Sequence, residues 1–254
     1  MDEKIGQVAV WIILAIILVA AMILFFTLGR ETNIVTLPSS DMVDPRAFME
    51  RCTAEYVNNA ADKMLLQGGF VYPKNTIRFN NTNIEYICEN VGFYSPCINQ
   101  HPLLLKEMEK EIRNNIYPFV TGCFDELKRE VEKRKGEIDM GALDIDVELS
   151  EDRIFVDLIR DIEITKRDAT NKYDKFDIVI ASPLYNLGAI AIEIASQEAQ
   201  YCYFESTGYS VYYPRYRVVK YAMSEPVRIY TIKDEKSGKE MNIAIRSCAM
   251  PPGI

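Results

Sequence analysis

The 254-residue chain has one histidine, one tryptophan and no surplus of positive charge. Histidine-dependent nucleophilic catalysis would have to use His101, which lies in a proline-flanked loop near a cysteine, so we assign it no catalytic role. A net charge of −8 gives no basic footprint for nucleic acid. Gly238-Lys239 lacks the upstream glycine of a phosphate-binding loop. The sequence therefore predicts no catalytic residue, no cofactor and no nucleic-acid partner.

Charged residues are also missing from Ile5–Gly29. Within Val8–Leu28, fourteen residues are Val, Ile, Leu or Phe, and each favours membrane insertion by about 0.3–0.6 kcal/mol. A helix of this length covers the hydrocarbon core, which is about 30 Å thick. A cleavable signal would have a shorter apolar core that ends in small residues, whereas this one ends in Phe25-Phe26-Thr27. We predict a single-pass anchor that contacts the lipid bilayer through Ile5–Leu28.

The N-terminus also leaves a second interpretation open. Lys4-Ile5-Gly6-Gln7 before an apolar helix resembles the processing site of archaeal type IV pilin-like proteins, which are cut after the glycine. That family carries a basic residue directly before the glycine, where this chain has Ile5. Its apolar helix also continues into the head, whereas Pro38 and Pro45 interrupt this chain. A pilin-like filament subunit processed after Gly6 is therefore an alternative to a permanent anchor.

Six cysteines all follow the predicted anchor. An even set in a tethered domain indicates disulfides and an oxidising compartment, which predicts a cytoplasmic N-terminus and an extracytoplasmic body at the cell membrane. The sequon at Asn80, a candidate glycosylation site, is compatible with that side. Many pairings are possible, and the positions on predicted elements favour Cys52–Cys123, Cys88–Cys97 and Cys202–Cys248.

The periodicity of apolar residues predicts an α+β fold with four parts. An N-terminal transmembrane helix at residues 1–29 is followed by a polar stalk at 30–43. Residues 44–136 show helical spacing around one hairpin and form a predicted helical subdomain. Residues 137–254 alternate apolar and acidic side chains and include one long helix. We expect this last part to be an antiparallel sheet packed by that helix.

Several element boundaries can be predicted within these parts. The hairpin is expected at Thr76–Phe79 and Ile84–Cys88. Pro118 is expected to break or kink the helical stretch that follows. In the second half, the long helix should run from Ser182 to about Phe204, and a strand should follow at about Tyr209–Tyr221.

Two patterns resemble metal sites, and neither is predicted to bind a metal. Cys88, Cys97 and His101 lack the fourth ligand and the close cysteine spacing of a zinc site, so a disulfide is favoured. Carboxylates alternate along residues 144–148 and 157–163, but a flat strand does not gather them around one calcium ion. These acidic rows indicate a solvated face.

One carboxylate falls on an apolar helical face. Glu198 lies in the middle of the inward arc of the long helix, and a buried carboxylate needs a partner. Glu198 lies one helical turn before Cys202, and Arg246 lies two strand residues before Cys248. Both steps span about 6 Å. A Cys202–Cys248 bridge would therefore place Arg246 against Glu198, provided that helix and strand run parallel. Arg160 is the reserve partner. We expect a structural ion pair here.

Tyrosine and arginine are abundant after the long helix. Both residue types are enriched at recognition surfaces, although tyrosine also packs well within strands. This stretch is therefore the candidate binding face. Its residues are Tyr209, Tyr212, Tyr213, Arg215, Tyr216 and Arg217.

Short motifs are distributed over most of the chain: Gln7-Val8-Ala9-Val10-Trp11, Gly68-Gly69-Phe70, Pro96–Pro102, Ile194–Ala199, Tyr230–Asp234 and the tail Pro251-Pro252-Gly253-Ile254. Together they resemble an uncharacterised set of single-pass membrane-anchored proteins from small-genome archaea of the DPANN group. The resemblance implies placement at the membrane. It supplies no activity and no functional residues that could be carried over to this chain.

The leading interpretation of the sequence is a membrane-anchored extracytoplasmic protein with a structural or recognition role at the cell surface. Its partner would be a cell-surface protein or glycan. Besides the pilin-like subunit, a surface enzyme of unknown chemistry is a further alternative, which would require a cleft that gathers carboxylates.

Overall fold

A computed structural model describes residues 43–249 except positions 93, 168 and 225, together with Leu18, Val19 and Met22. No helix within this described part is long and apolar enough to cross a bilayer. The predicted anchor and stalk lie almost entirely outside the described residues. The chain from Val43 onward forms one compact unit, so the boundary predicted between residues 136 and 137 does not separate two bodies.

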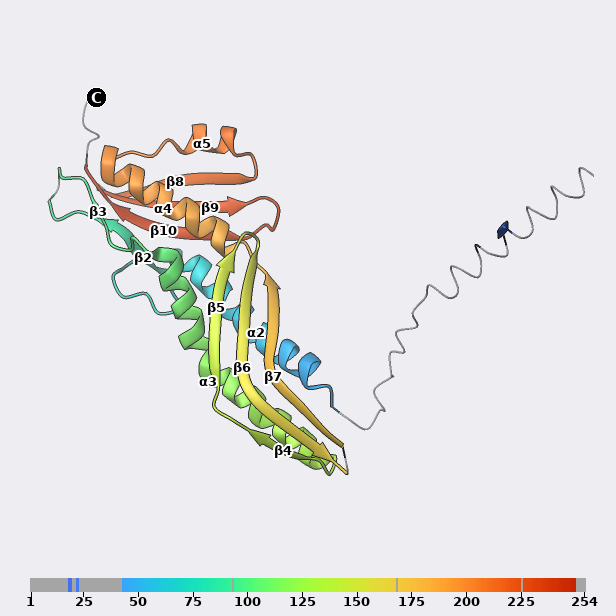
Figure 1. Ribbon diagram of the computed structural model, residues 1–254. Helices are drawn as coiled ribbons and strands as arrows, with labels where there is room; N and C mark the ends of the chain where they lie inside the picture. Colours follow the sequence, from blue (N-terminus) through green and yellow to red (C-terminus); the bar gives the residue numbers. More distant parts are fainter. Residues whose placement is uncertain are drawn as a thin grey trace, which may run out of the picture. The chain divides into compact units, whose positions relative to one another are not determined.

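Two long helices pack on a four-stranded antiparallel sheet (Figure 1). β4 and β5 pair with successive parts of one edge of β6, and β7 pairs along the other edge. The helices are α2 (Pro45–Leu66) and α3 (Leu104–Lys133). The strands are β4 (Glu137–Met140), β5 (Asp144–Ser150), β6 (Arg153–Lys166) and β7 (Ala169–Ala181).

Alternation along the strands separates an apolar face from an acidic face. Ile145, Val147 and Leu149 of β5 are buried, whereas the carboxylates between them are exposed. On the neighbouring strands, Lys175 lies 2.9 Å from Asp157 and 2.6 Å from Asp177. The acidic rows therefore lie on the solvated face, as expected. The described residues contain no group of His, Cys, Asp and Glu side chains arranged to hold a metal ion.

Pro118 was predicted to break or kink the helix, and it does not break it. α3 continues through it to Lys133. Pro118 is on the exposed side of α3, where water can replace the hydrogen bond that proline cannot donate. The opposite side buries an apolar stripe that keeps the helix on the core: Leu104, Met108, Ile112, Ile116, Val120, Phe124, Leu127 and Val131.

A second, mixed sheet has the order β1-β2-β10-β9-β8, and β3 pairs with β2. Its one parallel pair is β2 with β10, in which Ala244 lies opposite Tyr86. The predicted hairpin is thus confirmed, but it belongs to the same sheet as the C-terminal strands. The strands are β1 (Thr76–Phe79), β2 (Thr82–Glu89), β3 (Ile98–Asn99), β8 (Tyr216–Ser224), β9 (Val227–Asp234) and β10 (Glu240–Arg246).

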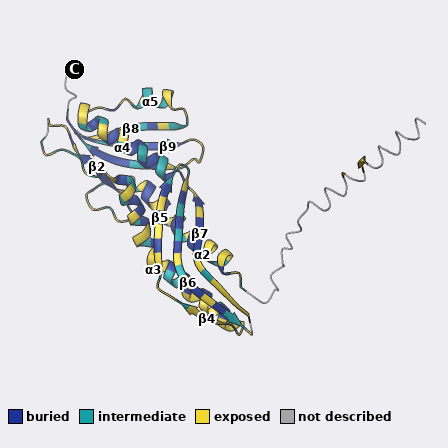
Figure 2. Cartoon of the chain, viewed as in Figure 1, coloured by how far each residue is buried: buried dark blue, intermediate teal, exposed yellow. Residues whose placement is uncertain are grey.

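The long helix α4 (Leu184–Tyr201) covers one face of this mixed sheet (Figure 1). Tyr230 and Ile243 are register partners, so they lie on the same face of the sheet, and both belong to the main core. Residues one position away face the opposite side, where Ile229 and Ala244 belong to a separate, smaller apolar cluster with Tyr86. Figure 2 shows the buried residues concentrated between the layers.

A short helix replaces the start of the strand predicted at Tyr209–Tyr221. α5 spans Ser206–Tyr212, and β8 begins only at Tyr216. The Glu205 carboxylate accepts hydrogen bonds from the backbone N–H groups of Thr207 and Gly208, at 3.1 and 3.4 Å. This N-terminal cap favours a helical turn over the extended chain that the tyrosines suggested.

Candidate functional site

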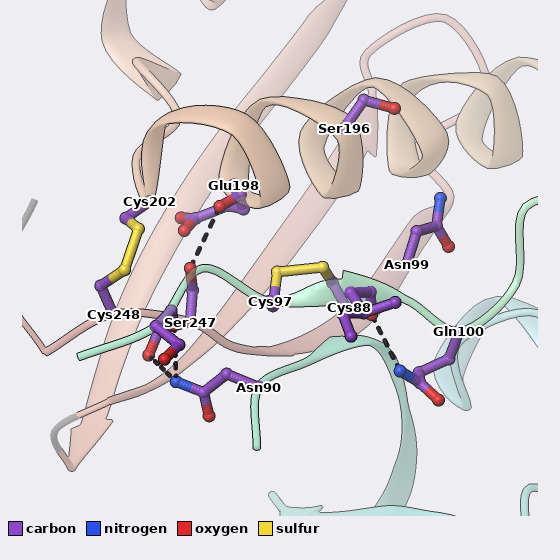
Figure 3. The surroundings of a disulfide bond; sticks show 12 residues. Cys88, Asn90, Cys97, Asn99, Gln100, Ser196, Glu198, Cys202, Ser247 and Cys248 are labelled. Carbon is purple, nitrogen blue, oxygen red and sulfur yellow. Dashed lines mark hydrogen bonds between the residues drawn. A yellow bond between two sulfur atoms is a disulfide. The ribbon is translucent and has the colours of Figure 1, made fainter. Parts of the chain in front are cut away.

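Three disulfides join the pairs expected from the sequence, and no cysteine is free. Cys52–Cys123 joins α2 to α3. Because Cys88 and Cys97 are bonded to each other, neither thiolate can serve as a zinc ligand with His101. Cys202–Cys248 ties the end of α4 to the segment after β10. Figure 3 shows the last two disulfides near α4.

Glu198 is fully buried at the α4–sheet interface and binds Arg228 and Tyr230. Arg228 Nη1 donates to Glu198 Oε2 at 2.8 Å, and the Tyr230 hydroxyl donates to Oε1. Burial and then the Glu198 charge raise the pKa of Tyr230. Arg228 Nη2 also donates to the Cys248 carbonyl at 2.9 Å, and Ser247 Oγ donates to the Glu198 carbonyl at 3.1 Å (Figure 3). Both carboxylate oxygens of Glu198 are therefore paired.

The buried ion pair was predicted with the wrong cation. Arg246 binds Glu89 and the Tyr86 hydroxyl. β10 ends at Arg246, so strand alternation does not extend to Cys248, and Arg246 faces away from α4. The reserve residue, Arg160, donates to the Gly141 carbonyl at 2.9 Å and lies 4.8 Å from the centre of the Phe124 ring.

Aromatic and apolar side chains remain exposed on the segment that follows this cluster. Tyr212 is 84% exposed and Val211 is 75% exposed, and no residue of α5 is buried (Figure 2). Lys220 of β8 lies 4.4 Å from the centre of the Tyr203 ring. Tyrosine is enriched at interaction surfaces, which makes this segment the candidate recognition site. We call Tyr201, Tyr203, Val211, Tyr212 and Tyr213 the tyrosine surface.

Only part of the predicted binding face belongs to this surface. Tyr212 and Tyr213 are exposed, and so is Arg217. Tyr209 is half-buried, with its ring centre 5.4 Å from that of Phe204 and 4.7 Å from that of Tyr213. Tyr216 is also half-buried.

Arg215 is engaged in an ion network and is not free to bind a partner. Its guanidinium donates to both oxygens of Asp234 and of Asp152, and Asp234 is fully buried. Hydrogen bonds from Arg215 and then from Lys236 lower the pKa of Asp152 to about 2. The network joins the β5–β6 turn to the mixed sheet, so its role is structural.

The candidate acceptor Asn80 lies at the exposed β1–β2 turn. Asn80 and Asn81 have φ angles of 46° and 64°, which asparagine tolerates and which two-residue hairpin turns require. The turn leaves the Asn80 side chain open to solvent.

Comparison with family models, curated proteins and solved structures finds no match for this chain. Its function is therefore argued from the residues alone.

Proposed function

We propose that this chain is a membrane-anchored extracytoplasmic protein that recognises a partner at the cell surface through the tyrosine surface. The observation that carries the proposal is the exposure of Tyr212, Val211 and their neighbours on a segment that the fold holds in place. The proposed anchor is Ile5–Leu28, with the N-terminus in the cytoplasm. The resemblance to single-pass archaeal membrane proteins supports the same placement.

The disulfides support an oxidising location for the body. Structural disulfides persist outside the cytoplasm and are rare within it, and all six cysteines of this chain are paired. The paired polar groups around Glu198 support a fixed geometry for the recognition segment, because they secure the α4 end just before Tyr201 and Tyr203. A surface with little freedom to lose binds at lower entropic cost.

Two experiments test the proposed placement. Protease added to intact cells should degrade the body, while an N-terminal tag stays protected; protection of both would contradict the placement. N-terminal sequencing that finds Gln7 as the first residue would instead favour the processed, filament-forming alternative.

For recognition, the Tyr212→Ala/Tyr213→Ala variant should bind the producing organism's cell envelopes at least about tenfold more weakly, since interface tyrosines are frequent hot spots. Tyr117→Ala on α3 is the matched control, because Tyr117 is exposed but lies outside the tyrosine surface. Equal binding by both variants would contradict the assignment.

A further inference from the structure

A pocket of about 370 Å³ contains the only histidine of the chain. It lies between the segment after α2, strand β2 and the first turns of α3, and it shares no residue with the tyrosine surface. Ligand pockets typically measure about 300–1,000 Å³, so this one suits a small molecule.

Internal contacts fix the floor of the pocket. His101 Nδ1 lies 2.6 Å from Glu107 Oε2, and Nε2 lies 3.6 Å from Glu85 Oε1. The buried Glu85 carboxylate also accepts hydrogen bonds from the backbone N–H groups of Lys74 and Asn75. The floor is therefore organised before any ligand arrives.

The carboxylates of the pocket already have protein donors. Glu85 and Glu107 face His101, and Glu111 Oε1 accepts from the backbone N–H groups of Val71 and Tyr72, at 3.2 and 3.0 Å. A carboxylate offers about four lone-pair positions. Glu107 and Glu111 therefore keep acceptor capacity for additional donors such as hydroxyl groups.

The cations at the pocket are different, because they have no protein partner. Lys74 and Lys110 line the pocket and are exposed. Within the described part of the chain, neither ammonium group forms an ion pair or a hydrogen bond. The Tyr72 side chain is 65% exposed and lies at the same opening. Lys63 Nζ lies over the Tyr72 ring, 4.6 Å from its centre, so one face of the ring is already covered. The groups left for a ligand are thus two cations, spare carboxylate acceptors and the other face of that ring.

We propose that this pocket binds a small sugar acid, that is, a sugar ring that carries a carboxylate. The carboxylate would pair with Lys74 and Lys110, and ring hydroxyls would donate to Glu107 and Glu111. The apolar face of the ring would pack on Tyr72. The carboxylates of the lining already have protein donors, whereas the two lysines have no ionic partner among the described residues, which favours an anionic ligand. The proposal does not depend on the tyrosine surface or on the membrane anchor.

Titration of the purified full chain with glucuronate tests this inference, with calorimetry as the readout. The Lys74→Met/Lys110→Met variant should lose at least about tenfold in affinity, because two charge-assisted contacts are removed. Both lysines lack side-chain partners, so the variant should fold, and circular dichroism checks this.

Lys128→Met is the matched control. Lys128 is an exposed lysine of the same helix, eighteen residues beyond Lys110, and so about 27 Å away along the axis. The Lys128→Met variant should bind glucuronate with the same affinity as the unmodified chain. A loss as large as that of the double variant would overturn the assignment of Lys74 and Lys110.

Neutral glucose and inorganic sulfate are the comparison ligands. Glucose should bind at least about tenfold more weakly than glucuronate, since it lacks the charge. Glucose that binds as well as glucuronate would overturn the role of the lysines. Sulfate that binds as tightly and competes with glucuronate would show a general anion site and overturn the sugar specificity. No heat of binding at millimolar glucuronate would overturn the whole inference.

Discussion

Glu198 and Arg228 form a 2.8 Å salt bridge between α4 and β9, and the carboxylate has no exposed surface. Arg228 is the only cation that contacts Glu198 among the described residues, and Tyr230 donates to the other oxygen. Removing one partner of a buried pair leaves an uncompensated charge.

Arg228→Met should therefore lower the free energy of unfolding by about 3–5 kcal/mol, measured by urea denaturation. Arg217→Met is the control, because Arg217 is exposed on the neighbouring strand, and it should change stability by less than about 0.5 kcal/mol. Equal stability of the two variants would mean that the buried pair contributes nothing.

His101 and Glu85 should make stability depend on pH. Burial opposes the charge on His101, but its contacts with the Glu85 and Glu107 carboxylates outweigh burial and raise the histidine pKa above 6.5. The stability that protonated His101 contributes is complete below pH 6.5 and is lost as the pH rises through the raised pKa of His101. Burial also opposes ionisation of Glu85, yet the contact with His101 and the hydrogen bonds from the Asn75 and Lys74 backbone N–H groups lower its pKa below 4.5. The stability that ionised Glu85 contributes is complete above pH 4.5 and is lost as the pH falls through the lowered pKa of Glu85.

The two contributions together should be largest between about pH 4.5 and 6.5. Urea denaturation of the unmodified chain and of His101→Gln across pH 3–9 measures this. The stability difference between them should shrink on both sides of that window. A difference that stays constant with pH would show that His101 does not titrate differently in the folded state.

The three disulfides should stabilise the body according to the loops they close. Cys52–Cys123 and Cys202–Cys248 span 71 and 46 residues, whereas Cys88–Cys97 spans 9. The chain-entropy model gives about 4 kcal/mol for each long loop and about 2.6 kcal/mol for the short one. Paired Cys→Ala variants, compared by urea denaturation, should follow this order. A larger loss from the Cys88–Cys97 pair would contradict the entropic account.

Pro118 should weaken the long helix without ending it. Pro118→Ala restores a backbone donor in an exposed helix interior, and we expect a gain of about 1–3 kcal/mol in the free energy of unfolding. Thermal denaturation provides the measurement. Arg113→Ala, also exposed on α3, controls for helix propensity alone. If Pro118→Ala is no more stable than that control, the missing hydrogen bond costs nothing here.

Periodicity predicted local elements better than their assembly. The helical spacing after Pro45 and the alternation around Val147 identify α2 and β5 correctly. The parallel pairing of β2 with β10 left no local signal, because it depends on residues such as Tyr86 and Ala244 that are far apart in sequence. Pro118 does not end α3, since the buried stripe on the other side of the helix outweighs one missing hydrogen bond.

The site was predictable to a similar degree. Burial of Glu198 follows from the helical wheel, but its cation depended on where β10 ends, and alternation alone cannot fix that. Three of the predicted binding-face residues, Tyr209, Arg215 and Tyr216, are engaged in internal contacts that only the tertiary structure reveals. For the His101 pocket one signal was available: Glu85 interrupts the apolar run of β2, and a charge at such a position marks a group that must find a partner.

The pairing of β2 with β10 sets the order in which this protein can mature. Glu89 and Arg246 are 157 residues apart, so β2 cannot pair with β10 until that intervening length has been synthesised. Cys88–Cys97 can close before β10 is synthesised, whereas Cys202–Cys248 cannot. A chain that has not yet paired β10 therefore carries an open edge of β2, and a truncation before Glu240 would leave that edge available for aggregation.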